Sequence, residues 1–489
     1  PPPPRRMRGL PACPRALALG LAVSARVRRG WSGGPVGPRR VPGFGAAARW
    51  QQAGRMPAGA GLRRPLLPGR RGGGGPSASP QQGSDGASMA QSVFNLAKNI
   101  VGIGVLSLPA AVAAGTGLIP AVILTVALGV YSGYTFSLYG RVCEATGERN
   151  FKGLGLATAG PRWASAMTWA CTLRTVFSCL AFSIVVADSF SAILQSFGAP
   201  AALCARNTVL GGMSLFVILP LCLLPDLSAL SYTSLLGSLG MLYTMVFMTV
   251  RRLDGSYAPG GAFFDAALAA GSASGRWSVN VSTLVLVSTL GTACSAHYNA
   301  PRFYEQLRNR SVGRFNTVVA VSFSVAVAMC LTAMCAGFQT FGAASRGNIL
   351  LNYSTRDPLA TAARIAVSSS VVCTYPLAFT GLRDGVLSLL GVPATKRNFC
   401  LATVGLLSTV TGLAWVIQNV AFVVNLGGAV FGALTVYIFP CVLFLLLKRK
   451  KARGPERQLA KATVVGGVLL ALLGSVVAVL TEFAPARLR

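Results

Sequence analysis

Apolar stretches of about 20 residues, each long enough to cross a bilayer as a helix, alternate with short polar segments from residue 92 onward. We predict eleven spanning helices, at residues 92–114, 118–139, 163–196, 208–224, 230–250, 279–299, 317–341, 359–381, 399–417, 421–447 and 463–482. The pattern therefore predicts an all-α polytopic membrane protein whose transmembrane domain covers residues 92–489.

The first stretch is interrupted in its middle by Gly102 and Gly104, which flank Ile103, and later by Pro109. Glycine weakens a helix, and unpaired backbone groups in hydrocarbon are costly, so such a break is tolerated only beside a polar cavity. We predict a discontinuous helix whose exposed backbone groups bind a small polar solute. A glycine pair that packs against a neighbouring helix explains the same residues and stays open as an alternative.

The sixth stretch is interrupted as well. Gly291 is followed by small residues from Thr292 to Ser295, and Pro301 ends the helix or begins a new segment. Many transporters place their site between two halves that each begin with a broken helix. We therefore predict a five-plus-five inverted repeat, with halves at 92–250 and 279–447 and an extra helix at 463–482. A small-residue packing face is the alternative for the sixth stretch.

Charge indicates orientation. The formal net charge is +32, and with a cytoplasmic N-terminus eighteen Lys and Arg of the transmembrane domain face the cytoplasm and eight face the other side. This asymmetry follows the positive-inside tendency, so we interpret the cations as orientation signals beside the lipid bilayer, with no nucleic-acid partner. The sequon at Asn352 then faces the lumen or the exterior, where we expect glycosylation.

Residues 1–91 are rich in Pro, Gly, Ala and Arg and have no sustained apolar period, which predicts disorder. Met7, Met56 and Met89 are alternative starts, so part of this segment is expected to be translated upstream sequence. An organelle transit peptide is the alternative. Twelve scattered cysteines and one histidine form no metal-binding pattern, and we expect no cofactor and no enzymatic activity.

Four segments occur in an order that resembles the amino acid/auxin permease family, in particular its sodium-coupled neutral and vacuolar amino acid transporter branch. They are SVFNLAKNIVGIGVLSLP, HYNAPRFYEQLRNRSVGRFNTVV, GNILLNYSTRDP and ARIAVSSSVVCTYPLAFTGLRDGV. The resemblance implies eleven helices in a leucine-transporter-like fold, which carries amino acids by alternating access in the plasma membrane or the vacuolar or lysosomal membrane. An amino acid sensor that transports little or nothing is the alternative.

The resemblance also implies a binding site. The first break would receive the carboxylate and amino groups of the substrate, since free amides favour the carboxylate and free carbonyls the ammonium. The second break would supply hydroxyl, thiol and backbone partners. The expected substrate-binding residues are Gly102, Ile103, Gly104, Thr292, Cys294 and Ser295.

Three residues bear on ion coupling. Thr374 matches a threonine that resembles a sodium ligand in sodium-coupled relatives, whereas Lys98 stands where those relatives have an asparagine. The Lys98 ammonium can take the space and charge of a cation, so we predict proton coupling or no ion coupling; snorkelling to the cytoplasmic headgroups is the alternative. His297 either relays protons or forms a structural hydrogen bond.

Charges elsewhere in the spans face a cavity or a partner. Arg174 and Asp188 are fourteen residues apart in the third stretch and are predicted not to pair with each other. Arg364 is interpreted as a gate or boundary charge, with headgroup contact as the alternative.

Overall fold

A computed structural model describes residues 86–224, 233–266, 277–393, 395–447 and 454–487. These residues form helices and loops, together with one isolated bridge between Ala87 and Leu307. The predicted disorder of residues 1–91 lies outside the described residues except for its last six. The described part of the chain is all-α, as the sequence predicts.

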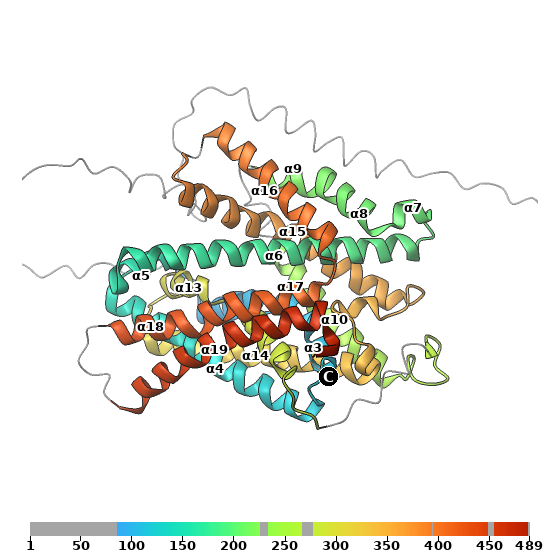
Figure 1. Ribbon diagram of the computed structural model, residues 1–489, viewed down its shortest axis with the longest axis horizontal. Helices are drawn as coiled ribbons and strands as arrows, with labels where there is room; N and C mark the ends of the chain where they lie inside the picture. Colours follow the sequence, from blue (N-terminus) through green and yellow to red (C-terminus); the bar gives the residue numbers. More distant parts are fainter. Residues whose placement is uncertain (1–85, 225–232, 267–276, 394, 448–453, 488–489) are drawn as a thin grey trace, which may run out of the picture. The chain divides into compact units, whose positions relative to one another are not determined.

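Helices follow one another along most of the described chain, and Figure 1 shows their arrangement. The first half holds α2 (Met89–Ile100), η2 (Ile103–Ser107), α3 (Leu108–Ala113), α4 (Leu118–Thr146), α5 (Phe151–Ala159), α6 (Pro161–Ser196), α7 (Ala201–Cys204), α8 (Arg206–Met213), η3 (Ser214–Ile218), α9 (Leu219–Cys222) and α10 (Thr233–Leu253). The second half holds α12 (Thr283–Ala293), η5 (His297–Asn299), α13 (Ala300–Gln306), α14 (Val312–Phe341), η6 (Gly342–Ala344), η7 (Ile349–Leu351), α15 (Pro358–Leu390), α16 (Lys396–Val416), α17 (Val420–Gly427), η8 (Gly428–Ile438), α18 (Phe439–Leu446), α19 (Pro455–Phe483) and η9 (Pro485–Arg487).

Seven helices in the described residues are long and apolar enough to cross a membrane, and the bent pair formed by α2 and the following η2–α3 segment brings the number to eight. The predicted count of eleven is not confirmed by this criterion. The other three predicted spans coincide with the shorter α8–α9 segment, with α10 and with the interrupted α12–α13 segment. Length and apolar composition make the chain an integral membrane protein.

The first helix begins three residues earlier than the sequence analysis predicted. Ser88 accepts a hydrogen bond from the backbone N–H of Gln91, and the Gln91 side chain accepts one from the N–H of Ser88. This reciprocal cap satisfies two N–H groups that a helix start leaves without partners. The helix therefore extends back to Met89, and the predicted boundary after residue 91 is too late.

Long helices pack side by side around the broken spans. The helix α6 lies along α15, α4 along α14, and α10 along α15 (Figure 1). Large apolar side chains nonetheless remain exposed on the spanning helices, with Val130 of α4 at 67% and Leu472 of α19 at 63%. Such side chains suit contact with lipid, because hydrocarbon is their favourable environment.

Glycines let α12 and η8 approach closely. A methyl group placed on Gly428 would lie 1.8 Å from the carbonyl oxygen of Ser288, and one on Gly432 would lie 2.9 Å from the backbone of Gly291. No larger residue fits at Gly428 unless the backbone moves. Small residues of this kind bring membrane helices into backbone contact.

Candidate functional site

The first span is broken where the sequence predicts it. The helix α2 ends at Ile100, η2 begins at Ile103, and the two parts are bent by 45°. The N–H of Gly102 donates to the Ile100 carbonyl at 2.9 Å, and the Gly102 carbonyl accepts from the N–H of Val105 at 3.2 Å. The N–H groups of Ile103 and Gly104 lie in the first turn of η2, which offers them no acceptor.

The two glycines of this break have different surroundings. A methyl group on Gly102 would meet no heavy atom within 4 Å, so this residue borders open space. A methyl group on Gly104 would lie 3.4 Å from the Cα atom of Ala293 in α12. Gly104 therefore lies at ordinary van der Waals distance from α12, whereas Gly102 has no neighbour this near.

The second break follows α12, which ends at Ala293. Residues 294–296 form no helix, and the chain continues through η5 and α13. The contact of Gly104 with Ala293 joins the two breaks directly, and both η2 and α3 pack against α12. The first and sixth predicted spans are thus both interrupted, and their interruptions meet inside the protein.

The side chains expected at the second break are already engaged. The Thr292 hydroxyl donates to the carbonyl of Val424 in α17 at 2.7 Å, and the Cys294 thiol is buried. The Ser295 hydroxyl lies 3.4 Å from the hydroxyl of Thr435 in η8. Thr292 and Ser295 therefore tie the break to the helices around it.

Arg174 of α6 completes the second break and was not assigned to it by the sequence analysis. Its Nη2 donates to the carbonyl oxygen of Ser295 at 2.7 Å, and its Nε donates to the Ser295 hydroxyl at 3.2 Å. The guanidinium also lies over the ring of Tyr298, 4.5 Å from the centroid. A cation here stabilises the negative end of the α12 dipole.

Lys98 and Thr374, the two residues that bear on sodium coupling, differ in their surroundings. Lys98 is half-buried in α2, and its ammonium forms no hydrogen bond or ion pair with any residue that the structure describes. Thr374 is exposed on α15, and its hydroxyl donates to the Ser370 carbonyl of the same helix at 2.8 Å. Sodium binding at Thr374 stays a prediction.

His297 is completely buried beside the second break. Its Nε2 lies 3.0 Å from the carbonyl oxygen of Ser132 and 3.1 Å from the hydroxyl of Thr135, both in α4. Since a carbonyl only accepts, Nε2 carries the proton in the contact with Ser132. This geometry matches the structural alternative, in which His297 fastens the break to α4; proton relay stays a prediction.

The expected glycosylation of Asn352 does not fit this fold. The side chain is 4% exposed, its Oδ1 accepts from the N–H of Arg346 at 2.8 Å, and its Nδ2 donates to the Ala344 carbonyl at 2.8 Å. A glycan is attached through this same nitrogen. The folded loop therefore has no room for it, because Asn352 holds the loop together from within.

Asp188 and Arg364, two other charged residues of the predicted spans, have partners in the protein. Asp188 pairs with Arg206 at 2.8 Å, so neither it nor Arg174 pairs with the other, as predicted. Arg364 is 1% exposed and donates to the carbonyls of Leu350 and Tyr353 at 3.0 and 2.5 Å. It organises the loop before α15, and neither a gate nor a headgroup contact describes this buried position.

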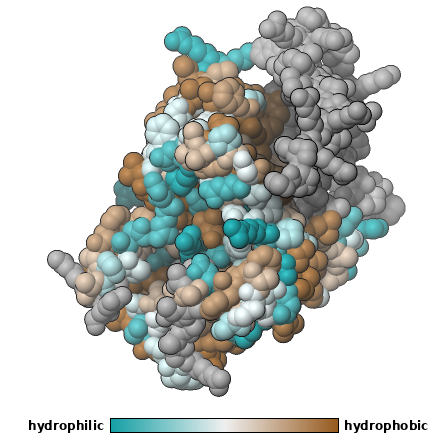
Figure 2. All heavy atoms as spheres, turned by 90° about the vertical axis from the view of Figure 1, so that its right-hand side faces the viewer, coloured by the Kyte–Doolittle hydropathy of each residue, from teal (hydrophilic) through white to brown (hydrophobic). Residues whose placement is uncertain are grey.

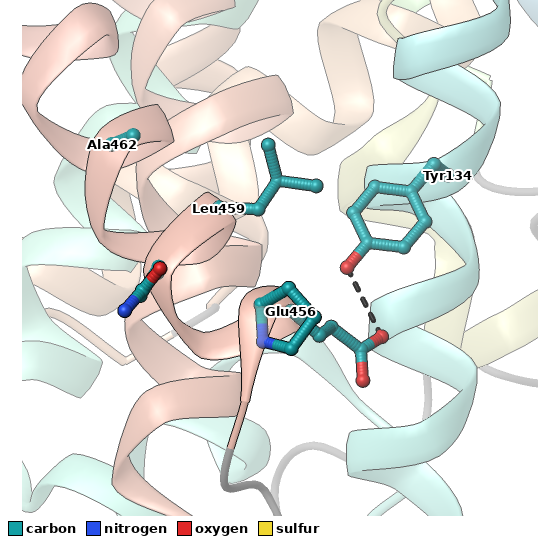
Figure 3. A pocket seen from close by; sticks show the side chains of 6 residues that line it. Tyr134, Glu456, Leu459 and Ala462 are labelled. Carbon is teal, nitrogen blue, oxygen red and sulfur yellow. Dashed lines mark hydrogen bonds between the residues drawn. The ribbon is translucent and has the colours of Figure 1, made fainter.

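A hollow of about 670 Å³ lies between α4 and the start of α19 (Figure 3). Tyr134 donates to Glu456 there at 3.1 Å, and Arg141 pairs with the same carboxylate at 2.5 Å. Leu459 and Ala462 form its apolar wall. No residue of either break lines this hollow, so it is separate from the broken helices.

Known proteins resemble this chain over most of its length. It is 24% identical over 405 residues to a Danio rerio protein with the provisional name sodium-coupled neutral amino acid transporter 11, covering 81% of this chain and 87% of that protein. It is 23% identical to vacuolar amino acid transporter 2 of Saccharomyces cerevisiae, covering 80% and 82%. A solved structure of Mhp1, a nucleobase-cation-symport-1 family transporter, gives a TM-score of 0.49 at 12% identity, over 84% of this chain and 95% of that one.

The family described as transmembrane amino acid transporter protein matches residues 85–480, which include both breaks and nearly every described helix. This match over most of the chain confirms the family resemblance of the four sequence segments. The chain belongs to the family of transmembrane amino acid transporter proteins.

Proposed function

We propose that this protein is a secondary active transporter that moves amino acids, most readily neutral ones, by alternating access. The observation that carries the proposal is the contact between the two interrupted spans, at Gly104 and Ala293. Free N–H groups of Ile103 and Gly104 would bind the substrate carboxylate, and carbonyls at the end of α2 would bind its ammonium. Open space beside Gly102 gives the substrate room.

We further propose proton coupling or no ion coupling, in preference to sodium coupling. The half-buried ammonium of Lys98 has no counter-ion among the described residues, and it belongs to the inner half of the first broken span. A fixed cation there would take the place of a bound sodium ion. At the second break, the guanidinium of Arg174 already occupies the carbonyl of Ser295, a group of the kind that coordinates sodium in broken helices.

Counterflow of labelled amino acids into proteoliposomes tests the proposal. We expect accumulation of at least one neutral amino acid when choline replaces sodium. A rate that follows a pH gradient would indicate proton coupling, and a rate independent of the gradient would indicate that no ion is coupled. Strict dependence on sodium would contradict the coupling proposal alone. Binding without movement of any amino acid would instead favour the sensor, and would contradict transport itself.

The variant Lys98→Asn tests whether Lys98 determines the ion coupling. We expect this variant to lose any response to the pH gradient or to gain stimulation by sodium, because the fixed cation is replaced by the asparagine found in sodium-coupled relatives. Lys152→Asn is the matched control, since Lys152 is an exposed lysine on α5 and should behave as the wild type. If both variants respond to the two ions as the wild type does, Lys98 has no role in coupling.

Arg174→Ala is expected to slow transport without preventing membrane insertion. The change removes charge-assisted hydrogen bonds worth about 1.5–3 kcal/mol, which corresponds to about a tenfold to a hundredfold loss. Arg174→Lys should recover part of the rate, because it keeps the charge but lacks the planar fork that bridges the two Ser295 oxygens. Uptake per molecule in the membrane is the measurement.

Arg162→Ala provides the control for Arg174, because Arg162 is exposed at the start of the same helix. We expect it to leave uptake unchanged. Equal uptake in the wild type and in Arg174→Ala would show that this cation is dispensable at the second break.

A further inference from the structure

A cavity of about 460 Å³ opens at the predicted outer end of the broken spans. Its walls come from α3, α12, α17 and α19, and from the loop at residues 343–347. Figure 2 shows the side of the molecule that is at the right in Figure 1, where polar side chains gather across the middle of the face. The volume falls in the range of small-molecule sites, which is about 300–1,000 Å³.

Opposite charges line this cavity without pairing with each other. Arg346 belongs to the loop wall and Glu482 to α19, and no ion pair joins them in the described residues. The Glu482 carboxylate accepts one hydrogen bond, from the Asn419 side chain at 2.7 Å. The Arg346 guanidinium has no hydrogen-bond partner among the described residues. A cavity with one anionic and one cationic wall is complementary to a zwitterion.

Asn425 gives an independent sign that a polar ligand belongs here. Its side chain lines the cavity and is only 3% exposed, yet its Oδ1 has no hydrogen-bond partner among the described residues. A buried polar atom left without a partner costs free energy, so a position of this kind usually has a ligand or water bonded to it. The carboxamide can meet either end of a zwitterion, because it both donates and accepts.

The cavity lies on the outer halves of both broken spans. Its floor includes Ala110 and Ala113 of α3, the helix that continues η2 beyond the first break. Its wall includes Thr289 of α12, one turn before Thr292 at the second break. Thr292 is bonded in turn to Val424, the residue preceding Asn425. A solute in the cavity would therefore touch the same helices that form the breaks.

We propose that this cavity is an outer capture site for amino acids, separate from the breaks, where Arg346 binds the α-carboxylate, Glu482 binds the α-ammonium and Asn425 completes the site. The inference rests on the proposed transport function. It assigns to the cavity the binding of substrates that arrive from the outer side, before they reach the break at Gly102.

Measuring uptake from each side of the membrane tests this role. Arg346→Gln and Glu482→Gln should each raise KM about tenfold for uptake from the outer side, since each removes a charge-assisted hydrogen bond. KM for uptake from the inner side and the maximal rate from the outer side should not change. The maximal rate from the inner side should fall in the same proportion as the outer KM rises, because a substitution does not alter the equilibrium of the transported amino acid and the substrate leaves through the weakened site. The measurement uses vesicles of both orientations and the labelled amino acid that the wild type exchanges fastest. A methyl ester of that amino acid should inhibit uptake from the outer side more weakly than the unlabelled amino acid does, because the ester lacks the carboxylate.

Arg356→Gln is the matched control, because Arg356 is an exposed arginine of the same outer loop that does not line the cavity. We expect it to keep the wild-type KM on both sides. An unchanged outer KM in both cavity variants, or an equal rise on both sides, would overturn the capture site. If the wild type itself moves no amino acid, the proposed function fails instead. Size-exclusion profiles of the purified variants identify any loss of folding, which these solvent-accessible positions should not cause.

Discussion

We expect that replacing Gly102 by leucine abolishes amino acid uptake, while the protein still inserts into the membrane and folds. The residue has a φ of −106°, which any L-amino acid adopts, and a Cβ atom there meets nothing within 4 Å. The leucine side chain would extend into the space beside the first break, where we propose that the substrate binds. Uptake per folded molecule in proteoliposomes is the measurement.

Gly405→Leu is the matched control for this change. Gly405 also has open space around a Cβ atom, but it lies on the exposed face of α16, away from the broken spans. We expect normal uptake from this variant, which shows that a new leucine in a spanning helix is tolerated. Uptake that survives Gly102→Leu would mean that the break is a packing feature, and the proposed site would have to be abandoned.

The second large effect concerns stability at the predicted outer end of α15. Asp357 is completely buried and accepts hydrogen bonds from Arg251 at 2.7 and 2.8 Å, from the Tyr257 hydroxyl at 3.0 Å and from the N–H of Leu359 at 2.9 Å. One carboxylate thus caps α15 and fastens it to the end of α10. Burial raises the pKa of the Tyr257 phenol, so the phenol keeps the proton that it donates.

Asp357→Ala should lower the free energy of unfolding by about 3–5 kcal/mol, because it removes the completely buried member of an ion pair and leaves the partly buried Arg251 and the Tyr257 hydroxyl without their shared acceptor. The measurement is thermal unfolding of the detergent-solubilised protein. Asp254→Ala is the control, since Asp254 pairs with the same arginine at 2.8 Å but is 33% exposed and only three residues away. Similar loss of stability in the two variants would contradict the role of Asp357 as a buried cap.

The interruptions of the two spans could be predicted from sequence because their cause is local. Gly102 and Gly104 together weaken any helix, and hydrocarbon does not satisfy the backbone groups that they expose. The different tasks of the two glycines could not be predicted, because Gly104 packs against Ala293, almost 200 residues later in the chain. A periodic pattern contains no information on such a contact.

The second break shows the same division. Small residues after Gly291 predicted its position, but its completion by Arg174 depends on how α6 lies against it. The sequence contains a single arginine inside an apolar stretch, which predicts that the arginine has a polar partner but does not identify that partner. Asn352 marks a limit of motif reading, because its sequon is formally complete while its amide is inside the folded loop.

The glycine contact between α12 and η8 restricts how the protein can change shape. With a backbone oxygen of Ser288 filling the place of a side chain at Gly428, the two segments cannot slide or turn past each other. We therefore expect them to move as one rigid body. In the proposed alternating access, the irregular residues 294–296 and Val101 and Gly102 are then the places where the two broken spans can flex. The closest backbone approach among the described glycines would thus direct the proposed motion to the two breaks.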